Sequence, residues 1–509
     1  MGASQSSGCV SQLTSQDRER MFASIPSAML MLKSDTFTPD VLATHCALLQ
    51  AECDRAAAAL AEGLSPERDR AVGCMLGLAV GDALGAPLEF IPVRYPGDPL
   101  PEGDSTPPAG FQQAGLWAEK SERRESNRFL LERGQWTDDT AMALCLADSL
   151  LANKGEFQPR DLRMRFALWW GLGYNNAFGL DQGRRAHWGH RGSVGLGGMV
   201  GDAHEEFKHA PCDYTSKGDL RSSGNGTIMR LAPVPVLCRH DVETAMEMAW
   251  CQSKTTHQGD EAADCARLLA WLCATAISGG AGKAALDALP AFPAKLYATA
   301  CLARAVKEER HPENEGADLE GRDWRWRTAE YRYYEPRIAN DRGYAGSYAM
   351  DGLAMALHCV AATWTFEDAV RRAASLCGDA DTVAAITGQI AGAIYGSSAI
   401  PGGWIDAVSQ WEQPIGAIRY RAWLLCELTP PMASAVRAHE RPNDGCWPAF
   451  EQRLADESRA QMVCEAEGTL STPMPHECSC GRGFVSLALL GLHKRKCAVF
   501  LQQHVMEPV

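Results

Sequence analysis

The chain has 509 residues, 46% of them hydrophobic, which is enough for one large domain or several ordinary ones with a sizeable core. Its 63 acidic and 49 basic side chains give a net charge of −14, which argues against nucleic-acid binding through bulk electrostatics. The 19 cysteines are odd in number and follow no regular framework, which argues against a disulfide scaffold and favours a reducing compartment, cytoplasmic or nuclear.

The first 68 residues are predicted to form a tail and a helical extension. The opening MGASQS matches the template for N-terminal myristoylation, and Cys9 offers a second acylation site. Two interpretations stay open: a lipid anchor that associates the protein with a membrane, or an unmodified disordered tail. No secretory signal is recognisable, and the length of the apolar stretch 71–81 suits a buried core helix better than a membrane span, so no transmembrane segment is expected.

From 69 to 430 the dominant pattern is helical, and this part is predicted to be one all-α domain. Apolar residues recur at intervals of three and four, whereas alternating strand patterns are not recognisable. The clearest helical segments are 141–151, 262–277, 350–364 and 383–395. Two polar stretches, 93–134 and 306–342, are predicted to be loops inserted into the helical body.

Two of the helical segments carry a glycine every four residues. On a helix this spacing gathers the glycines on one face, although each costs about 1 kcal/mol relative to alanine. We expect very close approach of another helix to compensate that cost. The glycines are Gly73, Gly77, Gly81 and Gly85 in the first segment, and Gly388, Gly392 and Gly396 in the second.

Two acidic clusters are the most informative feature of the chain. The segment TDDT (137–140) and the segment DADT (379–382) each precede an apolar helix. Capping of the helix N-terminus is one explanation, but one carboxylate would suffice for it. If the clusters face each other, several like charges share a small volume, and a bound cation is the simplest way to neutralise them. Carboxylate and hydroxyl ligands favour magnesium, with manganese as the alternative.

The chain resembles the ADP-ribosylglycohydrolase family in five ordered blocks, which span residues 70 to 400. The blocks are GLAVGDALGAPLE (77–89), GQWTDDT (134–140), GNGTIMRLAP (224–233), SKTTH (253–257) and GDADT (378–382). This resemblance implies an all-α fold with two magnesium ions in a central cleft. It also implies hydrolysis of the glycosidic bond between ADP-ribose and an acceptor, which is a modified protein side chain or a related conjugate.

Six residues match the metal ligands that the resemblance implies, with Asp381 as the expected bridge between the ions. They are Thr137, Asp138, Asp139, Asp379, Asp381 and Thr382. Asp138, Asp381 and Glu89 are the expected catalytic residues, since a carboxylate near the metals can act as a general base on water. An ordinary solvated glutamate is the alternative for Glu89. Asp82 is expected to orient a neighbour or cap a turn.

Further residues are candidates for contact with the ligand. Gly224, Asn225 and Gly226 form a loop whose amides can approach a diphosphate, and the glycine-rich stretch 192–198 is open to the same interpretation. Arg230 is expected either on a phosphate or in a salt bridge.

The resemblance places His257 near the ribose of the ligand, although a lone histidine is most often structural. Tyr344 can stack on adenine or belong to the core. A non-catalytic ADP-ribose-binding or structural protein on the same fold is the alternative function, because the family includes lens crystallins.

Residues 431–475 are predicted to form a linker, and residues 476–500 resemble one zinc finger of the CCHC kind. Its expected ligands are Cys478, Cys480, His493 and Cys497. Only one residue separates the first two cysteines, which departs from the usual spacing, and His476 could replace one of them. A small hairpin with free thiols is the alternative. The finger would bind a protein or a nucleic acid.

Overall fold

The computed structural model describes residues 54–95, 129–178, 181, 193–209, 211–219, 222–308, 322–332, 342–412, 416–437, 476–477 and 483–484. The chain divides into two compact units, Met1–Glu440 and Arg441–Val509.

The described part of the larger unit is built from helices, as the sequence predicts. Its α-helices are α3 (Pro66–Gly85), α6 (Asp138–Ala152), α7 (Pro159–Leu172), α9 (Gly198–His209), α10 (Pro233–Leu237), α11 (Val242–Lys254), α12 (Asp260–Gly279), α13 (Tyr297–Arg304), α15 (Ala349–Ala361), α16 (Phe366–Ser375), α17 (Ala380–Tyr395), α18 (Gly402–Ser409), α19 (Ala417–Glu427) and α20 (Ala433–Arg437). Short 3₁₀ turns connect them at η3 (Ala86–Leu88), η4 (Asn225–Thr227), η5 (Gly282–Ala291), η7 (Arg342–Tyr344) and η8 (Ser397–Ala399).

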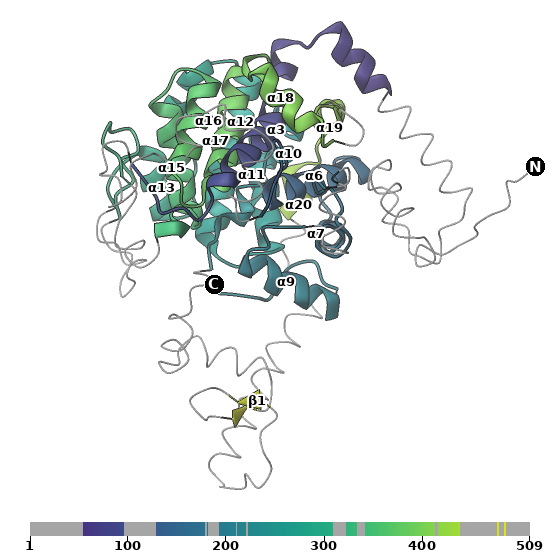
Figure 1. The fold of residues 1–509 in the computed structure, drawn as a ribbon, viewed down its shortest axis with the longest axis vertical. Helices are drawn as coiled ribbons and strands as arrows, with labels where there is room; N and C mark the ends of the chain where they lie inside the picture. The colour runs from purple at the N-terminus through teal and green to yellow at the C-terminus, as the bar shows by residue number, and fades with distance from the viewer. Residues whose placement is uncertain are drawn as a thin grey trace, which may run out of the picture. The chain divides into compact units, whose positions relative to one another are not determined.

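Helices α3 and α17 lie side by side at the centre of this unit, although some 300 residues separate them in the sequence (Figure 1). Their glycine faces meet. A Cβ atom on Gly77 would lie 2.2 Å from the carbonyl oxygen of Gly388, and one on Gly392 would lie 1.9 Å from that of Gly73. Real side chains do not tolerate such distances, so the two backbones can come this close only where the facing position on at least one helix is glycine. The predicted close approach is confirmed.

The two helices run antiparallel, and this direction determines what lies at the end of their interface. Gly85, at the end of α3, packs on Ala380 at the start of α17, while Gly73 packs near Gly396 at the other end. Asp82 on α3 therefore lies about one helical turn from the start of α17. The glycine interface brings the last turn of one helix to the acidic first turn of the other.

Helix α3 is stabilised by a cap at its N-terminus and by burial within the fold. The Ser65 side chain accepts a hydrogen bond from the Arg68 amide, and Pro66 occupies the first helical position, where its missing amide costs nothing. The stretch Pro66–Leu88 is the one helix in the described chain that is long and apolar enough to cross a membrane, and it is almost entirely buried within the fold. The prediction of a core helix for 71–81 is confirmed.

The larger unit continues past the boundary predicted at residue 430. Helix α20 packs on α11, with Val436 buried, and the compact unit extends to Glu440. The start of the predicted linker is therefore part of the helical body.

In the second unit the described residues are β1 (His476–Glu477) and β2 (Gly483–Phe484), which pair antiparallel with His476 opposite Phe484. Cys478 and Cys480 fall between these strands in the sequence. The four predicted zinc ligands lie outside the described residues, as do Gly2 and Cys9 of the predicted lipid anchor.

Candidate functional site

The two acidic clusters of the sequence meet in one place. The hydroxyl of Thr137, just before α6, lies 3.3 Å from Oδ2 of Asp381 in the first turn of α17. The same hydroxyl lies 3.2 Å from Oδ2 of Asp139. Residues some 240 positions apart in the chain therefore share one buried site.

The first turn of α6 is capped by Asp82 and not by its own aspartates. The Asp82 carboxylate accepts hydrogen bonds from the amides and the hydroxyls of both Thr137 and Thr140, at 2.7–3.1 Å. Asp82 thus caps a helix, as expected, but a helix 55 residues further along the chain. Because Asp82 satisfies these donors, capping does not explain why Asp138 and Asp139 are present.

Carboxylate oxygens form two overlapping groups that share Asp381. Asp82, Asp139 and Asp381 have oxygens within 4.8 Å of one another, and so do Glu89, Asp379 and Asp381. The shared position of Asp381 supports its predicted bridging role, which stays a prediction. Buried oxygens without a hydrogen-bond partner remain on Asp139 (Oδ1) and on Glu89 (Oε2).

Burial and mutual repulsion both act on these carboxyls. Desolvation is the largest cause, and the neighbouring carboxylates add to it, so that the pKa values of Glu89, Asp138, Asp139 and Asp381 lie well above their ordinary values. Among the described residues none of these four groups forms an ion pair with a lysine or an arginine. Within the described residues Arg230 acts on Asp138 through its charge alone, so no ion pair there neutralises the carboxylates of the site.

A divalent cation with a preference for oxygen fits this arrangement. Unpartnered carboxylate oxygens in a buried site are the donors that magnesium and manganese accept, and a soft metal would require thiolates or imidazoles. Thr382, buried beside Asp379 and Asp381, adds a hydroxyl oxygen to the set. Asp139, Asp379 and Asp381 therefore lie where such an ion could contact them, and the ligand roles of all six residues stay predictions.

Glu89 reaches the site because backbone hydrogen bonds hold its segment. The Phe90 amide donates to the Gly378 carbonyl at 2.8 Å, and the Gly378 amide donates to the Ile91 carbonyl at 2.7 Å. Gly378 has a φ of +68°, which favours glycine, and Phe90 has a φ of +67°. This pair of bonds holds Glu89 beside Asp379, and the structure does not support the interpretation of Glu89 as an ordinary solvated side chain.

Tyr344 is 47% exposed and packs edge-to-face on Phe90, with ring centroids 5.1 Å apart. It is therefore not a core aromatic, and its partner Phe90 directly follows Glu89 in the sequence. Stacking of Tyr344 on adenine stays a prediction.

Asn225 contacts a predicted metal ligand. Its side-chain amide donates to Oδ2 of Asp379 at 2.8 Å and to the Gly346 carbonyl at 3.0 Å. Both amide hydrogens are thus used within the protein, and the side chain is buried. The side-chain amide of Asn225 therefore orients a carboxylate, and the approach of the 224–226 loop to a diphosphate stays a prediction.

His257 and Arg230 lie behind the 224–226 loop. The imidazole packs against Gly224 and Gly226, where an added Cβ would come within 3.1 Å of it. Arg230 was expected on a phosphate or in a salt bridge, but its fully buried guanidinium donates to Gln252 and to the hydroxyl of Thr256 instead. Both residues are buried in the fold, and their contact with the ligand stays a prediction.

Burial determines the ionisation of both residues. Desolvation, followed by the charge of Arg230, lowers the pKa of His257 to about 3, so the ring is neutral near pH 7. Desolvation also lowers the pKa of Arg230 to about 9.

The glycine-rich stretch 192–198 touches the site at one residue. Gly195 has a φ of +85°, and a Cβ placed on it would lie 1.9 Å from Oδ1 of Asp138. Only glycine allows the backbone to lie directly against this carboxylate. The sequence shows that the segment is rich in glycine, but the contact between Gly195 and Asp138 could not be predicted from it.

Comparison with known proteins places the chain in a family. The family model described as ADP-ribosylglycohydrolase matches residues 64–440. The chain is 31% identical to ADP-ribosylarginine hydrolase Tri1 of Pseudomonas putida (strain GB-1), over 69% of this chain and 78% of that protein. It is 29% identical to ADP-ribosyl-[dinitrogen reductase] glycohydrolase of Rhodospirillum rubrum, over 66% and 90%.

A solved structure titled ADP-ribosylglycohydrolase-related protein complex is also similar, with a TM-score of 0.50 and 30% identity, over 71% of this chain and 100% of that one. The family model covers all five sequence blocks and both carboxylate groups of the site. The chain therefore belongs to the ADP-ribosylglycohydrolase family of glycosidic-bond hydrolases.

Proposed function

We propose that this protein is a magnesium-dependent hydrolase that releases ADP-ribose from modified arginine side chains of proteins. The observation that carries the proposal is the convergence of both acidic clusters and Glu89 on one site, where no described lysine or arginine forms an ion pair with these carboxylates. The choice of arginine is supported by the relatives in Pseudomonas putida and Serratia proteamaculans, which are both named ADP-ribosylarginine hydrolases.

Magnesium supplies a Lewis-acid charge that can hold sugar hydroxyls and lower the pKa of water, and manganese is the close alternative. Asp138, Asp139, Asp379 and Asp381 would hold the ions, together with the hydroxyls of Thr137 and Thr382. Positive charge develops at the anomeric carbon as the glycosidic bond breaks, and the surrounding carboxylates stabilise that charge electrostatically.

Glu89 is the carboxylate best placed to accept a proton. Its Oε2 atom is buried and has no hydrogen-bond donor, so the lone pairs are available to a water molecule. Desolvation and the neighbouring Asp381 raise its pKa, which makes it a stronger base than an exposed glutamate. The neutral amide of Asn225 and the cap formed by Asp82 fix the neighbouring carboxylates and threonines before the substrate binds.

The test is a panel of substrates in which ADP-ribose is linked to arginine, to serine or to a second ADP-ribose unit. We expect release of free ADP-ribose from the arginine linkage with magnesium, and loss of release with EDTA. Asp138→Ala should lower kcat by on the order of a thousandfold. Manganese in place of magnesium tests the choice of ion.

Two outcomes would contradict this function in different ways. Preferential hydrolysis of another linkage would replace arginine as the acceptor. Tight binding of ADP-ribose without turnover of any linkage would support the alternative, a binding or structural protein on the same fold.

For the second unit we propose that residues 476–500 bind one zinc ion and act as an interaction module for a protein or nucleic-acid partner. The antiparallel pairing of β1 and β2 on either side of Cys478 and Cys480 supports a knuckle of this kind. Zinc content measured before and after His493→Ala and Cys497→Ser tests it, and equal zinc in all three proteins would contradict it.

A myristoyl group on Gly2 is proposed on the N-terminal motif alone. The intact mass of the protein, made with and without an N-myristoyltransferase, tests this modification.

A further inference from the structure

The backbone of the 193–198 segment lies against a predicted magnesium ligand. A Cβ atom on Gly195 would lie 1.9 Å from Oδ1 of Asp138, and the φ of +85° at Gly195 also favours glycine. Glycine loses more conformational freedom on folding than any other residue, so Gly195 does not hold itself in this position. The residues on either side of it must fix the backbone beside the carboxylate.

On the N-terminal side, Ser193 anchors the segment. Its buried hydroxyl donates a hydrogen bond to the Trp169 carbonyl at 2.5 Å. Trp169 belongs to α7, which packs on α6, the helix that begins with Asp138. Ser193 therefore attaches the segment to the same pair of helices that positions the carboxylate.

On the C-terminal side, Leu196 is the one residue between Gly195 and α9 that carries a side chain, because Gly197 and Gly198 follow it. Cβ atoms on these two glycines would meet no atom of the described residues within 4 Å, so packing does not require glycine at either position. Two adjacent glycines allow the backbone more rotation than residues with side chains do. The side-chain restraint on this side of Gly195 therefore comes from Leu196.

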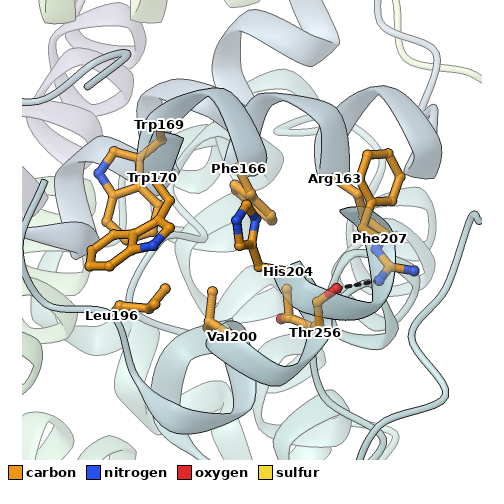
Figure 2. A pocket seen from close by; sticks show the side chains of 10 residues that line it. Arg163, Phe166, Trp169, Trp170, Leu196, Val200, His204, Phe207 and Thr256 are labelled. Carbon is orange, nitrogen blue, oxygen red and sulfur yellow. Dashed lines mark hydrogen bonds between the residues drawn. The ribbon is translucent and has the colours of Figure 1, made fainter. Parts of the chain in front are cut away.

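The Leu196 side chain fills most of the space between α7 and α9. Figure 2 shows it next to Val200 of α9 and beneath the indole rings of Trp169 and Trp170 of α7. Its Cδ2 atom lies 3.5 Å from the position of a Cβ atom on Gly201, which is ordinary van der Waals contact. The cavity that remains among these side chains is about 10 Å³, room for about one water molecule. Leu196 therefore has little room to leave this position.

We propose that Ser193 and Leu196 are positioning residues of the magnesium site. Together they hold the backbone of Gly195 against Asp138 and so keep this carboxylate in one orientation. The inference rests on the proposed function, because it takes Asp138 to be a ligand of the ion. Magnesium requires nearly ideal octahedral geometry, and groups that orient its ligands typically account for about 10- to 100-fold in metal affinity. Neither side chain needs to touch the ion or the substrate for this effect.

The test measures the Kd of magnesium by calorimetry on the full-length protein. Leu196→Ala should weaken binding about tenfold, because the backbone beside Asp138 loses one of its two anchors. Leu196→Met keeps an apolar side chain of similar volume and should restore most of the affinity. Ser193→Ala removes one neutral hydrogen bond and should weaken binding about threefold.

Leu151→Ala is the matched control. Leu151 is also partly buried against the hydrophobic core, but it lies at the opposite end of α6 from Asp138. Urea denaturation in EDTA should show a loss of stability in both leucine variants, since each loses apolar contacts. Only Leu196→Ala should change the Kd of magnesium. A Kd weakened to the same extent in both variants would indicate a general loss of packing and overturn the inference.

The remaining outcomes separate this inference from the proposed function. An unchanged Kd in Leu196→Ala would overturn the inference and leave the proposed function intact. Should Leu196→Ala fail to fold, an unchanged Kd in Ser193→Ala would overturn it in the same way. The expected pattern of Kd values, without release of ADP-ribose from modified arginine, would contradict the proposed function and support the positioning roles. A native protein that binds neither magnesium nor manganese would overturn both.

Discussion

Helix α6 carries buried aspartates near both of its ends, and their surroundings differ. Near its end, Asp148 accepts hydrogen bonds from Arg421 at 2.7 Å, from Tyr174 at 2.5 Å and from Asn175 at 2.9 Å. Burial acts to raise its pKa, but the charge and hydrogen bonds of Arg421 outweigh it, and the pKa of Asp148 lies below the ordinary value. At the start of the helix, burial and like charges raise the pKa values of Asp138 and Asp139.

The difference separates structural charges from functional ones. Asp148 has a structural role, and an arginine on another helix, Arg421, forms an ion pair with it. At the start of α6 the described chain supplies neutral donors and further carboxylates but no ion pair to a lysine or an arginine. A buried charge without a partner costs several kcal/mol, so a cation from outside would stabilise this site.

Removal of the charge should have opposite effects on stability at the two ends of α6. Asp148→Asn leaves the guanidinium of Arg421 largely buried without its counter-charge, and we expect the free energy of unfolding to fall by about 3 kcal/mol. Asp139→Asn, in protein freed of metal with EDTA, relieves repulsion and should raise it by on the order of 1 kcal/mol. Urea denaturation of both variants beside the native protein measures the two signs. A loss of similar size in both would remove the distinction.

Added magnesium should stabilise the protein through the carboxylate site at the start of α6 and not through Asp148 near its end. At roughly 100 times its Kd, an ion that binds only the folded state adds about 2.7 kcal/mol. We expect this increment in the native protein and in Asp148→Asn, and its loss in Asp138→Ala. Thermal unfolding with and without magnesium gives the comparison, and an undiminished shift in Asp138→Ala would contradict the proposed ligand set.

Asn225 and Asn175 each donate a hydrogen bond to a buried aspartate, and their removal should differ in its effect on metal affinity. Asn225→Ala removes the donor that orients Asp379, and the loss of such a partner typically weakens metal binding by about 10- to 100-fold. Asn175→Gly is the matched control, because Asn175 serves Asp148 and has a φ of +61° that glycine adopts readily. Calorimetric titration with magnesium should show a weaker Kd only in the first variant.

His257 avoids an unpaired charge in a third way, by staying neutral. Its folded pKa of about 3 lies below the value of about 6.5 expected when unfolded, so the unfolded state binds more protons between these values. Its share of stability is complete above pH 6.5 and is lost as the pH falls, by about 2 kcal/mol between pH 7 and pH 5. His257→Gln should remove this part of the pH dependence of unfolding. An unchanged slope would assign the dependence to other groups.

Much of the fold and of the site could be predicted from residues that are neighbours in the sequence. The four-residue spacing of glycine predicted the α3–α17 contact, because a smooth helix face serves no purpose without a close partner. Carboxylates beyond the needs of capping identified residues 137–140 and 379–382. Both features depend on local spacing, which the chain displays directly.

The roles of several other residues could not be predicted in this way. Arg230, His257 and Asn225 belong to blocks that suggested ligand contact, and their contacts within the protein could not be read from those blocks. Which protein groups a polar side chain meets depends on what packs over it, and the packing comes from distant segments.

The sequence by itself determined the helical class, the glycine faces and the chemical type of the ligands, because periodicity and donor chemistry are properties of a few adjacent residues. Only the tertiary structure decided which buried carboxylates receive an arginine and which receive none. That decision depends on partners such as Arg421, which lies 273 positions from Asp148.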